Sequence, residues 1–433
     1  MSSFLFAAWG FNTHVDPFLA VARAVREAGH EVYFYTDAEH RPSVESIGCR
    51  LLPFRALSQS RAEELIGQVI HDRRRPWRLW QYWRQFLIDT IPAQVEDLRH
   101  CLADARPDVL VADIALWGSL AVLREAERIP VAALSHVALC LEPGGTSGPV
   151  PGGAMPPRRT PIQRFRARVR EALASPAAHD ARRRVNAVRA RYDLPPLELR
   201  MTQMVGTMDL YLIPASPSFD YNRTDLPSNV RYIGPCLYPS PAPFSPIRTA
   251  GPRVVVDEGA LFAKEQRMVR AAIEGLGSHH DVTVIMGKGR PSLLESSSRR
   301  VTVRAYRPVQ EALGEANLLV TNGNSDSVMA ALAQGIPLVV VPSIMDQLEI
   351  GLRVQECGAG VLLPESSCSP SALAAAVTRV LGDPAYRAAA ARQGAELRAL
   401  SGAGLAVRYL EELADRFRRP RPAEALTPLL AEQ

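Results

Sequence analysis

A histidine and an aspartate in the N-terminal half of the chain have residue types and positions that suit a general base. His14 lies shortly after residues 4–8, an apolar run typical of a buried strand, and Asp113 directly follows a second such run, residues 107–112. If the two strands are parallel, their carboxyl ends meet at one edge of a sheet. A carboxylate next to an imidazole fixes its tautomer and stabilises the imidazolium that forms when the ring removes a proton. The pair therefore indicates a base dyad. Two alternatives stay open: His14 only hydrogen-bonds its loop, and Asp113 only caps a helix.

A second polar loop follows a strand in the C-terminal half. The sequence LLVTNGNSDSVMAALAQG, residues 318–335, begins with a short apolar strand and runs into an Asn/Gly/Ser loop. A helix is predicted from about Ser327 to Gly335, and a further strand, residues 337–341, completes a βαβ unit. Loops at the carboxyl ends of strands in open α/β sheets bind ligands, and helix N-termini attract phosphate. This loop is the predicted ligand site.

Large aromatic rings recur in residues 61–100, a segment predicted to be largely helical. A spacing of three residues places four of them on one broad helical stripe: Trp77, Trp80, Trp83 and Phe86. Most such stripes belong to a core, but this density of rings favours the lining of a lipophilic pocket. Interleaved arginines leave contact with nucleic acid or a membrane surface as a minor alternative.

The elements that must position these groups alternate between strand and helix. A helix is predicted to open at residues 14–17, capped by Asp16 with Pro17 in its first turn, and to stop at Gly29 before a strand at residues 31–36. Residues 162–192 predict a basic amphipathic helix packed on the sheet, and residues 144–159 a Gly/Pro-rich mobile loop. Further strands are predicted at residues 210–213, 253–256, 282–286 and 301–305, and a helix at 264–276.

This alternation predicts an α/β protein of two doubly wound Rossmann-like domains that face each other across a cleft. The N-terminal domain is predicted to span residues 1–235, followed by a proline-rich linker at residues 236–252. The C-terminal domain spans residues 253–433, and its last helices can pack back on the N-terminal domain.

Composition limits the classes of function. The chain has 433 residues, 47% of them hydrophobic, and a net charge of +5, which argues weakly for an anionic ligand and does not imply nucleic acid. Its six cysteines show no metal-ligand spacing and indicate reduced thiols. No apolar run reaches the roughly 18 residues of a membrane span, and no signal peptide is recognised. We expect a cytoplasmic protein that contacts neither nucleic acid nor a membrane.

Four segments carry a resemblance to a known family. They are THVDP at residues 13–17, FDYNRTDLPSNVRYIGP at residues 219–235, YRP at residues 306–308 and the box from residue 322 to 347. In order and spacing the chain resembles, over nearly its whole length, the nucleotide-sugar-dependent glycosyltransferases of the GT-B fold. It is most similar to the macrolide- and natural-product-type bacterial members of the UDP-glycosyltransferase superfamily.

The resemblance implies an inverting O-glycosyltransferase. His14, supported by Asp113, would deprotonate an acceptor hydroxyl, which displaces a nucleoside diphosphate from the anomeric carbon of the sugar. The implied sugar-donor residues are Gly259, Tyr306, Asn322, Gly323, Asn324, Ser327, Asp346 and Gln347. Asp346 and Gln347 would hold sugar hydroxyls, and Ser327 would contact phosphate. The resemblance implies no metal or resident cofactor, a UDP- or dTDP-sugar co-substrate, a small lipophilic acceptor, and a monomer or homodimer.

The departures from the family pattern cluster in the predicted phosphate loop. This chain has Asn322, Asn324, Ala330, Tyr306 and Ala260 where the family usually has His, Gly, Glu, Trp and Ser or Thr. Asp326 stands where Gly or Asn is usual. An ionised carboxylate about 5 Å from a diphosphate would cost on the order of 3 kcal/mol per charge pair at an effective dielectric constant near 20. The alternative function is therefore a catalytically silent or repurposed GT-B homologue that acts as an auxiliary or aglycone-binding protein.

Overall fold

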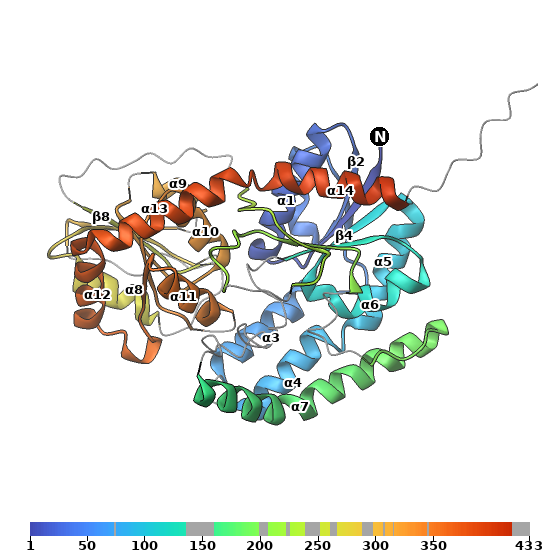
Figure 1. Ribbon diagram of the computed structural model, residues 1–433, viewed down its shortest axis with the longest axis horizontal. Helices are drawn as coiled ribbons and strands as arrows, with labels where there is room; N and C mark the ends of the chain where they lie inside the picture. The colour runs from blue at the N-terminus through green and yellow to red at the C-terminus, as the bar shows by residue number, and fades with distance from the viewer. Residues whose placement is uncertain are drawn as a thin grey trace, which may run out of the picture.

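The computed structural model describes residues 1–72, 75–135, 160–198, 207–221, 226–238, 252–259, 266–287, 298–305, 308–314, 316–343 and 346–417. These residues form two lobes, each built on a parallel β-sheet (Figure 1). We call the lobe around the first sheet the N-lobe and the lobe around the second sheet the C-lobe. The predicted loop at residues 144–159 lies outside the described residues.

The sheet of the N-lobe has seven parallel strands in the order β3-β2-β1-β4-β5-β6-β7. Their bounds are β1 (Ser3–Ala7), β2 (Glu31–Thr36), β3 (Arg50–Pro53), β4 (Val109–Asp113), β5 (Val131–Leu134), β6 (Leu210–Ile213) and β7 (Val230–Tyr232). The chain moves outward from β1 through β2 to β3 and then returns to the other side of β1 with β4. The switch point between β1 and β4 is where open α/β sheets bind ligands.

Helices cover both faces of this sheet, which is why its central strands are almost continuously apolar. Phe4 and Phe6 of β1 pack on the same face as α1 (Asn12–Glu27) and α14 (Ala403–Phe417). Leu5 and Ala7 pack on the opposite face with α5 (Ile91–Ala105) and α6 (Trp117–Ala126). Further α-helices in the described part of the lobe are α2 (Arg41–Ser46), α3 (Gln59–His71), α4 (Pro76–Leu87) and α7 (Pro161–Arg189).

The sheet of the C-lobe has six parallel strands in the order β10-β9-β8-β11-β12-β13. The strands are β8 (Arg253–Asp257), β9 (Asp281–Ile285), β10 (Val301–Arg304), β11 (Leu318–Thr321), β12 (Leu338–Val340) and β13 (Gly360–Leu362). One face carries α8 (Arg267–Leu276) and α12 (Pro370–Gly382). The other carries α10 (Ser325–Ala333), α11 (Gln347–Glu356) and α13 (Pro384–Ala399), with the short α9 (Gln310–Leu313) nearby. The prediction of two doubly wound Rossmann-like domains is confirmed.

Some predicted boundaries are wrong. α1 begins at Asn12, so His14 lies in its first turn, Asp16 is not its cap and Pro17 lies inside the helix. The helix can start early because the Phe11 carbonyl accepts the N–H of Val15 at 2.9 Å, and a proline at position 17 removes only the bond to the Thr13 carbonyl. The long helix α7 contacts α5 and α6.

The last helix, α14, leaves the C-lobe and lies along α1 of the N-lobe (Figure 1). Its Leu410 and Leu413 are buried with Phe18 and Val21 of α1. Glu411 accepts a hydrogen bond from His30, at 2.9 Å, just after α1. Most of the predicted linker, residues 236–252, lies outside the described residues, so the domain boundaries stay a prediction.

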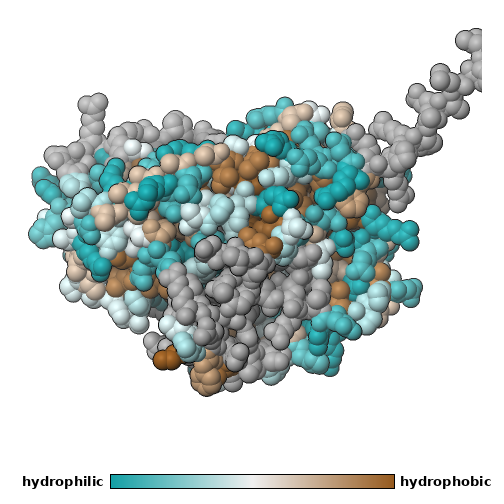
Figure 2. Space-filling model, viewed as in Figure 1, coloured by the Kyte–Doolittle hydropathy of each residue, from teal (hydrophilic) through white to brown (hydrophobic). Residues whose placement is uncertain are grey.

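The face shown in Figure 2 is mostly hydrophilic, with apolar side chains gathered near its middle. Within the described part of the chain, no helix is long and apolar enough to cross a membrane. Five described cysteines, Cys49, Cys101, Cys236, Cys357 and Cys368, are free thiols.

Candidate active site

His14 and Asp113 are in contact at the switch point of the N-lobe. Ala7 of β1 pairs with Ala112 of β4, so the residues that follow both strands meet at one edge. The Nδ1 atom of His14 lies 2.5 Å from Oδ2 of Asp113, whose side chain is fully buried. The other carboxylate oxygen, Oδ1, accepts the N–H of Ala115 at 2.8 Å and caps a short helical turn. Asp113 therefore caps this helical turn and also orients the ring of His14. Because Nδ1 faces Asp113, Nε2 is the ring nitrogen that can take a proton.

A cluster of aromatic rings extends from His14 toward α4. Phe11 lies 5.5 Å from His14 and 5.9 Å from Phe86, measured between ring centroids. Phe86 is 4% exposed and also contacts Trp9 and Trp83, at 4.8 and 6.1 Å. Phe86 of the predicted stripe is thus connected to His14 through Phe11, and Trp83 packs on Phe86.

Two other residues of the predicted stripe lie differently. Trp80 is half-buried against the core, whereas 66% of Trp77 is exposed near the start of α4. Trp77 therefore does not join the ring cluster that reaches His14. Phe11 and Trp9 were not predicted as site residues, although their position directly after β1 was the available signal.

The switch point of the C-lobe lies between β8 and β11, where Thr321 pairs with Asp257. The α10 helix begins at Ser325, two residues before the predicted start, because Asn324 is its N-cap and accepts the Asp326 N–H. Asn322 bridges to the neighbouring loop: its amide donates to the carbonyl of Glu258 at 2.9 Å. Its oxygen accepts the N–H of Asn324 at 3.1 Å.

Two predicted glycines allow these loops to approach closely. Gly259 (φ 75°) and Gly323 (φ 94°) adopt left-handed conformations. A Cβ on Gly259 would lie 2.9 Å from the amide nitrogen of Asn322, and one on Gly323 would lie 2.9 Å from the carbonyl oxygen of Gln347. The close packing of both loops therefore requires glycine at these two positions. Tyr306 lies outside the described residues.

Ser327, the predicted phosphate contact, hydrogen-bonds a residue that the sequence did not single out. Its hydroxyl donates to Oδ2 of Asp257 at 2.5 Å. Burial raises the pKa of the Asp257 carboxyl, and the hydrogen bonds from Ser327 and Gly259 partly offset this rise. Asp257 directly follows the apolar residues of β8, just as Asp113 ends β4. Asp113 was selected because it is an acidic residue directly after an apolar strand, and the same criterion would also have selected Asp257.

Asp326 faces the N-lobe across the interlobe cavity. Thr13 and Asp16 of α1 line this cavity together with Asp326, Ser327 and Asp257 of the C-lobe. Burial raises the pKa of Asp326 well above its usual range, and the nearby carboxylates Asp16 and Asp346 raise it further. These effects favour the protonated carboxyl, so the repulsion expected for an ionised Asp326 is reduced.

The remaining predicted residues begin α11. Asp346 occupies its N-cap position, and Gln347 is its first residue. The side-chain oxygen of Gln347 accepts both the N–H and the hydroxyl of Ser343, at 3.0 and 3.1 Å. The interlobe cavity measures about 30 Å³, far below the roughly 300–1,000 Å³ of a ligand pocket.

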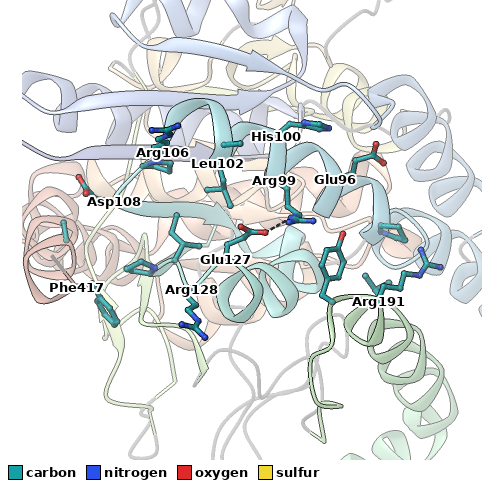
Figure 3. A pocket seen from close by; sticks show the side chains of 18 of the residues that line it. Glu96, Arg99, His100, Leu102, Arg106, Asp108, Glu127, Arg128, Arg191 and Phe417 are labelled. Atoms are coloured by element: carbon teal, nitrogen blue, oxygen red, sulfur yellow. Dashed lines mark hydrogen bonds and ion pairs between the residues drawn. The ribbon is translucent and has the colours of Figure 1, made fainter. Parts of the chain in front are cut away.

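A larger pocket of about 950 Å³ lies at the opposite edge of the N-lobe sheet (Figure 3). It is lined by Asp108, just before β4, and by Arg99, which pairs with Glu127 at 2.5 Å. None of the predicted site residues lines it. Because parallel sheets bind ligands at the carboxyl ends of their strands, we place the active site at the interlobe cavity.

The family model described as "Erythromycin biosynthesis protein CIII-like, C-terminal domain" matches residues 275–413. The chain is 32% identical to 4'-demethylrebeccamycin synthase of Lentzea aerocolonigenes, over 92% of this chain and 96% of that protein. It is 22% identical to demethyllactenocin mycarosyltransferase of Streptomyces fradiae, over 92% and 84% of the two chains.

Solved structures share the fold over nearly the whole chain. The glycotransferase of kitacinnamycin superimposes with a TM-score of 0.74 at 19% identity, covering 95% of this chain and 99% of that one. Spinosyn rhamnosyltransferase SpnG complexed with thymidine diphosphate gives a TM-score of 0.67 at 19% identity, covering 95% and 100%.

Two Rossmann-like domains whose switch points face each other define the GT-B fold. The relatives identify the chemistry of the class. The chain belongs to the macrolide- and natural-product-type glycosyltransferases of the UDP-glycosyltransferase superfamily, as the sequence resemblance predicted. It is an enzyme that transfers a sugar to an acceptor.

Proposed function

We propose that the enzyme is an inverting O-glycosyltransferase that uses a UDP- or dTDP-sugar and a lipophilic natural-product acceptor, with His14 as the general base and Asp113 as its support. The observation that carries this proposal is the 2.5 Å contact between the two side chains. Asp113 holds Nδ1, so Nε2 can remove the proton of an acceptor hydroxyl. An imidazolium formed in this step lies beside a buried carboxylate, which stabilises it.

The surroundings of the dyad support the choice of substrates. The buried Phe11 and Phe86 and the partly buried Trp83 make the side of His14 toward α4 apolar, which supports a lipophilic acceptor. The N-terminus of α10 lies across the interlobe cavity and offers backbone N–H groups and a favourable dipole to phosphate. Solved structures of SpnG were obtained with spinosyn aglycone and with thymidine diphosphate, which favours the same pair of substrate types here.

The test is sugar transfer by wild-type enzyme and His14→Ala, with UDP- and dTDP-sugars and a panel of lipophilic hydroxylated acceptors. Loss of a general base should lower the transfer rate about 100- to 10,000-fold. Nucleotide affinity, measured by calorimetry, should stay within about twofold because His14 is not among the residues that line the interlobe cavity. Asp113→Asn should likewise lower the transfer rate and leave nucleotide affinity nearly unchanged. Parallel loss of transfer and nucleotide binding in His14→Ala would contradict this role.

A further inference from the structure

Both oxygens of the Asp257 carboxyl have hydrogen-bond partners within the predicted phosphate site. Oδ2 accepts the Ser327 hydroxyl at 2.5 Å, and Oδ1 accepts the Gly259 N–H at 3.0 Å. The side chain of Asp257 is 3% exposed, and all three residues line the interlobe cavity. The carboxyl therefore engages two hydrogen-bond donors that stand where a phosphate is expected to bind.

The direction of the Ser327 hydroxyl hydrogen determines whether Ser327 can donate a hydrogen bond to a phosphate in the cavity. A serine hydroxyl has a single hydrogen and two lone pairs. While the hydrogen points to Asp257, Ser327 presents only lone pairs to the cavity, and these repel a phosphate oxygen. A neutral group at position 257 that can donate to Ser327 Oγ would turn the hydrogen toward the cavity.

We propose that Asp257 is a positioning residue of the sugar-donor site, whose carboxylate holds the Ser327 hydroxyl so that phosphate gains this hydrogen bond only when Asp257 releases it. The proposal rests on the nucleotide-sugar donor of the proposed function. Burial raises the pKa of Asp257, which makes the neutral form more accessible and supports release. The competing role is a structural one, in which Asp257 only closes the turn at Gly259 and braces α10.

A double-mutant cycle of Asp257→Asn and Ser327→Ala separates these roles. The affinities of dTDP and UDP are measured by calorimetry at about pH 8. Asparagine keeps an acceptor for the Gly259 N–H and can donate to Ser327 Oγ. We expect Asp257→Asn to tighten nucleotide binding about tenfold or more, the effect of one hydrogen bond to a charged group.

The second arm of the cycle gives the sharper readout. Ser327→Ala should change affinity less than about twofold in the wild-type background and weaken it about tenfold in the Asp257→Asn background. The matched control is Asp281→Asn, at the start of β9 on the opposite edge of the same sheet, which should leave affinity unchanged.

An equal effect of Ser327→Ala in both backgrounds would overturn the inference, as would unchanged affinity in Asp257→Asn. If Asp257→Asn loses its melting transition, Asp257→Ser takes its place, because a serine hydroxyl can still accept from Gly259. Nucleotide binding with additive effects of Asp257→Asn and Ser327→Ala overturns this inference alone. No nucleotide binding by any of these proteins overturns the sugar-donor assignment of the proposed function and this inference with it.

Discussion

At the residue scale, groups from both lobes determine the pKa of the Asp326 carboxyl. It lies in the first turn of α10, yet Asp16, which helps to raise its pKa, belongs to α1 of the other lobe. Helix N-termini normally stabilise carboxylates, so position within the helix alone predicts an ionised side chain. Burial and the two neighbouring carboxylates act in the opposite direction. This outcome depends on contacts between lobes that one sequence does not reveal.

We predict that Asp326→Asn stabilises the protein in a pH-dependent way. A folded-state pKa above the unfolded value of about 3.9 means that ionisation costs folding energy. The cost is absent below the unfolded pKa and grows as pH rises toward the raised folded pKa. The melting temperature of Asp326→Asn should therefore exceed that of the wild type by roughly 2 °C or more at pH 8, and the two should converge near pH 4. An equal difference at both pH values would contradict the assignment.

The sequence was sufficient to pair His14 with Asp113, because both follow strands that the apolar pattern identifies. The geometry of adjacent parallel strands then brings them together. It was not sufficient for Ser327, whose partner is determined by side-chain packing between β8 and α10. The rest of the site depends on the same kind of tertiary contact.

At the element scale, the two ends of α4 have different environments. Phe86 is buried among Trp9, Phe11 and Trp83, whereas Trp77 is largely exposed. A three-residue spacing drifts around a helix of 3.6 residues per turn, so the rings cannot all point the same way. The sequence correctly predicted a helix here but could not determine which rings its neighbours would cover.

This difference predicts unequal effects of truncation. Phe86→Ala should lower the free energy of unfolding by about 3–5 kcal/mol, the usual cost of removing a buried aromatic side chain. Trp77→Ala should change it by less than about 0.5 kcal/mol, as for other exposed positions. Urea denaturation followed by circular dichroism measures both. A larger effect for Trp77 would show that α4 is oriented differently.

At the scale of the whole molecule, a buried ion pair joins the lobes. Arg353 of α11 is 1% exposed and lies 3.2 Å from Asp220, which follows β6 in the N-lobe. Its guanidinium also lies 4.2 Å from the ring centroid of Tyr221. Tyr232 donates its hydroxyl to the other Asp220 oxygen at 2.7 Å. The sequence predicted two lobes, but contacts of this kind, between distant segments, determine how the lobes are placed.

We predict that Arg353→Ala costs about 3–5 kcal/mol of stability, because it removes the buried guanidinium charge that the Asp220 carboxylate contacts. Arg353→Lys should cost less but not restore wild-type stability, since lysine lacks the planar group that stacks on Tyr221. Thermal melting of both variants measures this. Wild-type stability in Arg353→Ala would mean that other contacts hold the lobes together.

The chain passes between the lobes twice, after β7 and before α14, and the two passages touch. Gly234 (φ 83°) and Gly402 (φ 51°) lie there. A Cβ on Gly402 would collide with the carbonyl oxygen of Pro235, and one on Gly234 would lie 2.8 Å from Cβ of Leu400. Because both passages lie at one place, we expect any rotation of one lobe relative to the other to pivot there. Cys236, two residues from Gly234, lines the interlobe cavity, whereas α4 lies on the opposite side of the molecule from α14 (Figure 1). The interlobe cavity therefore lies close to this pivot, and such a rotation would displace the aromatic rings of α4 farther than the residues that line the cavity.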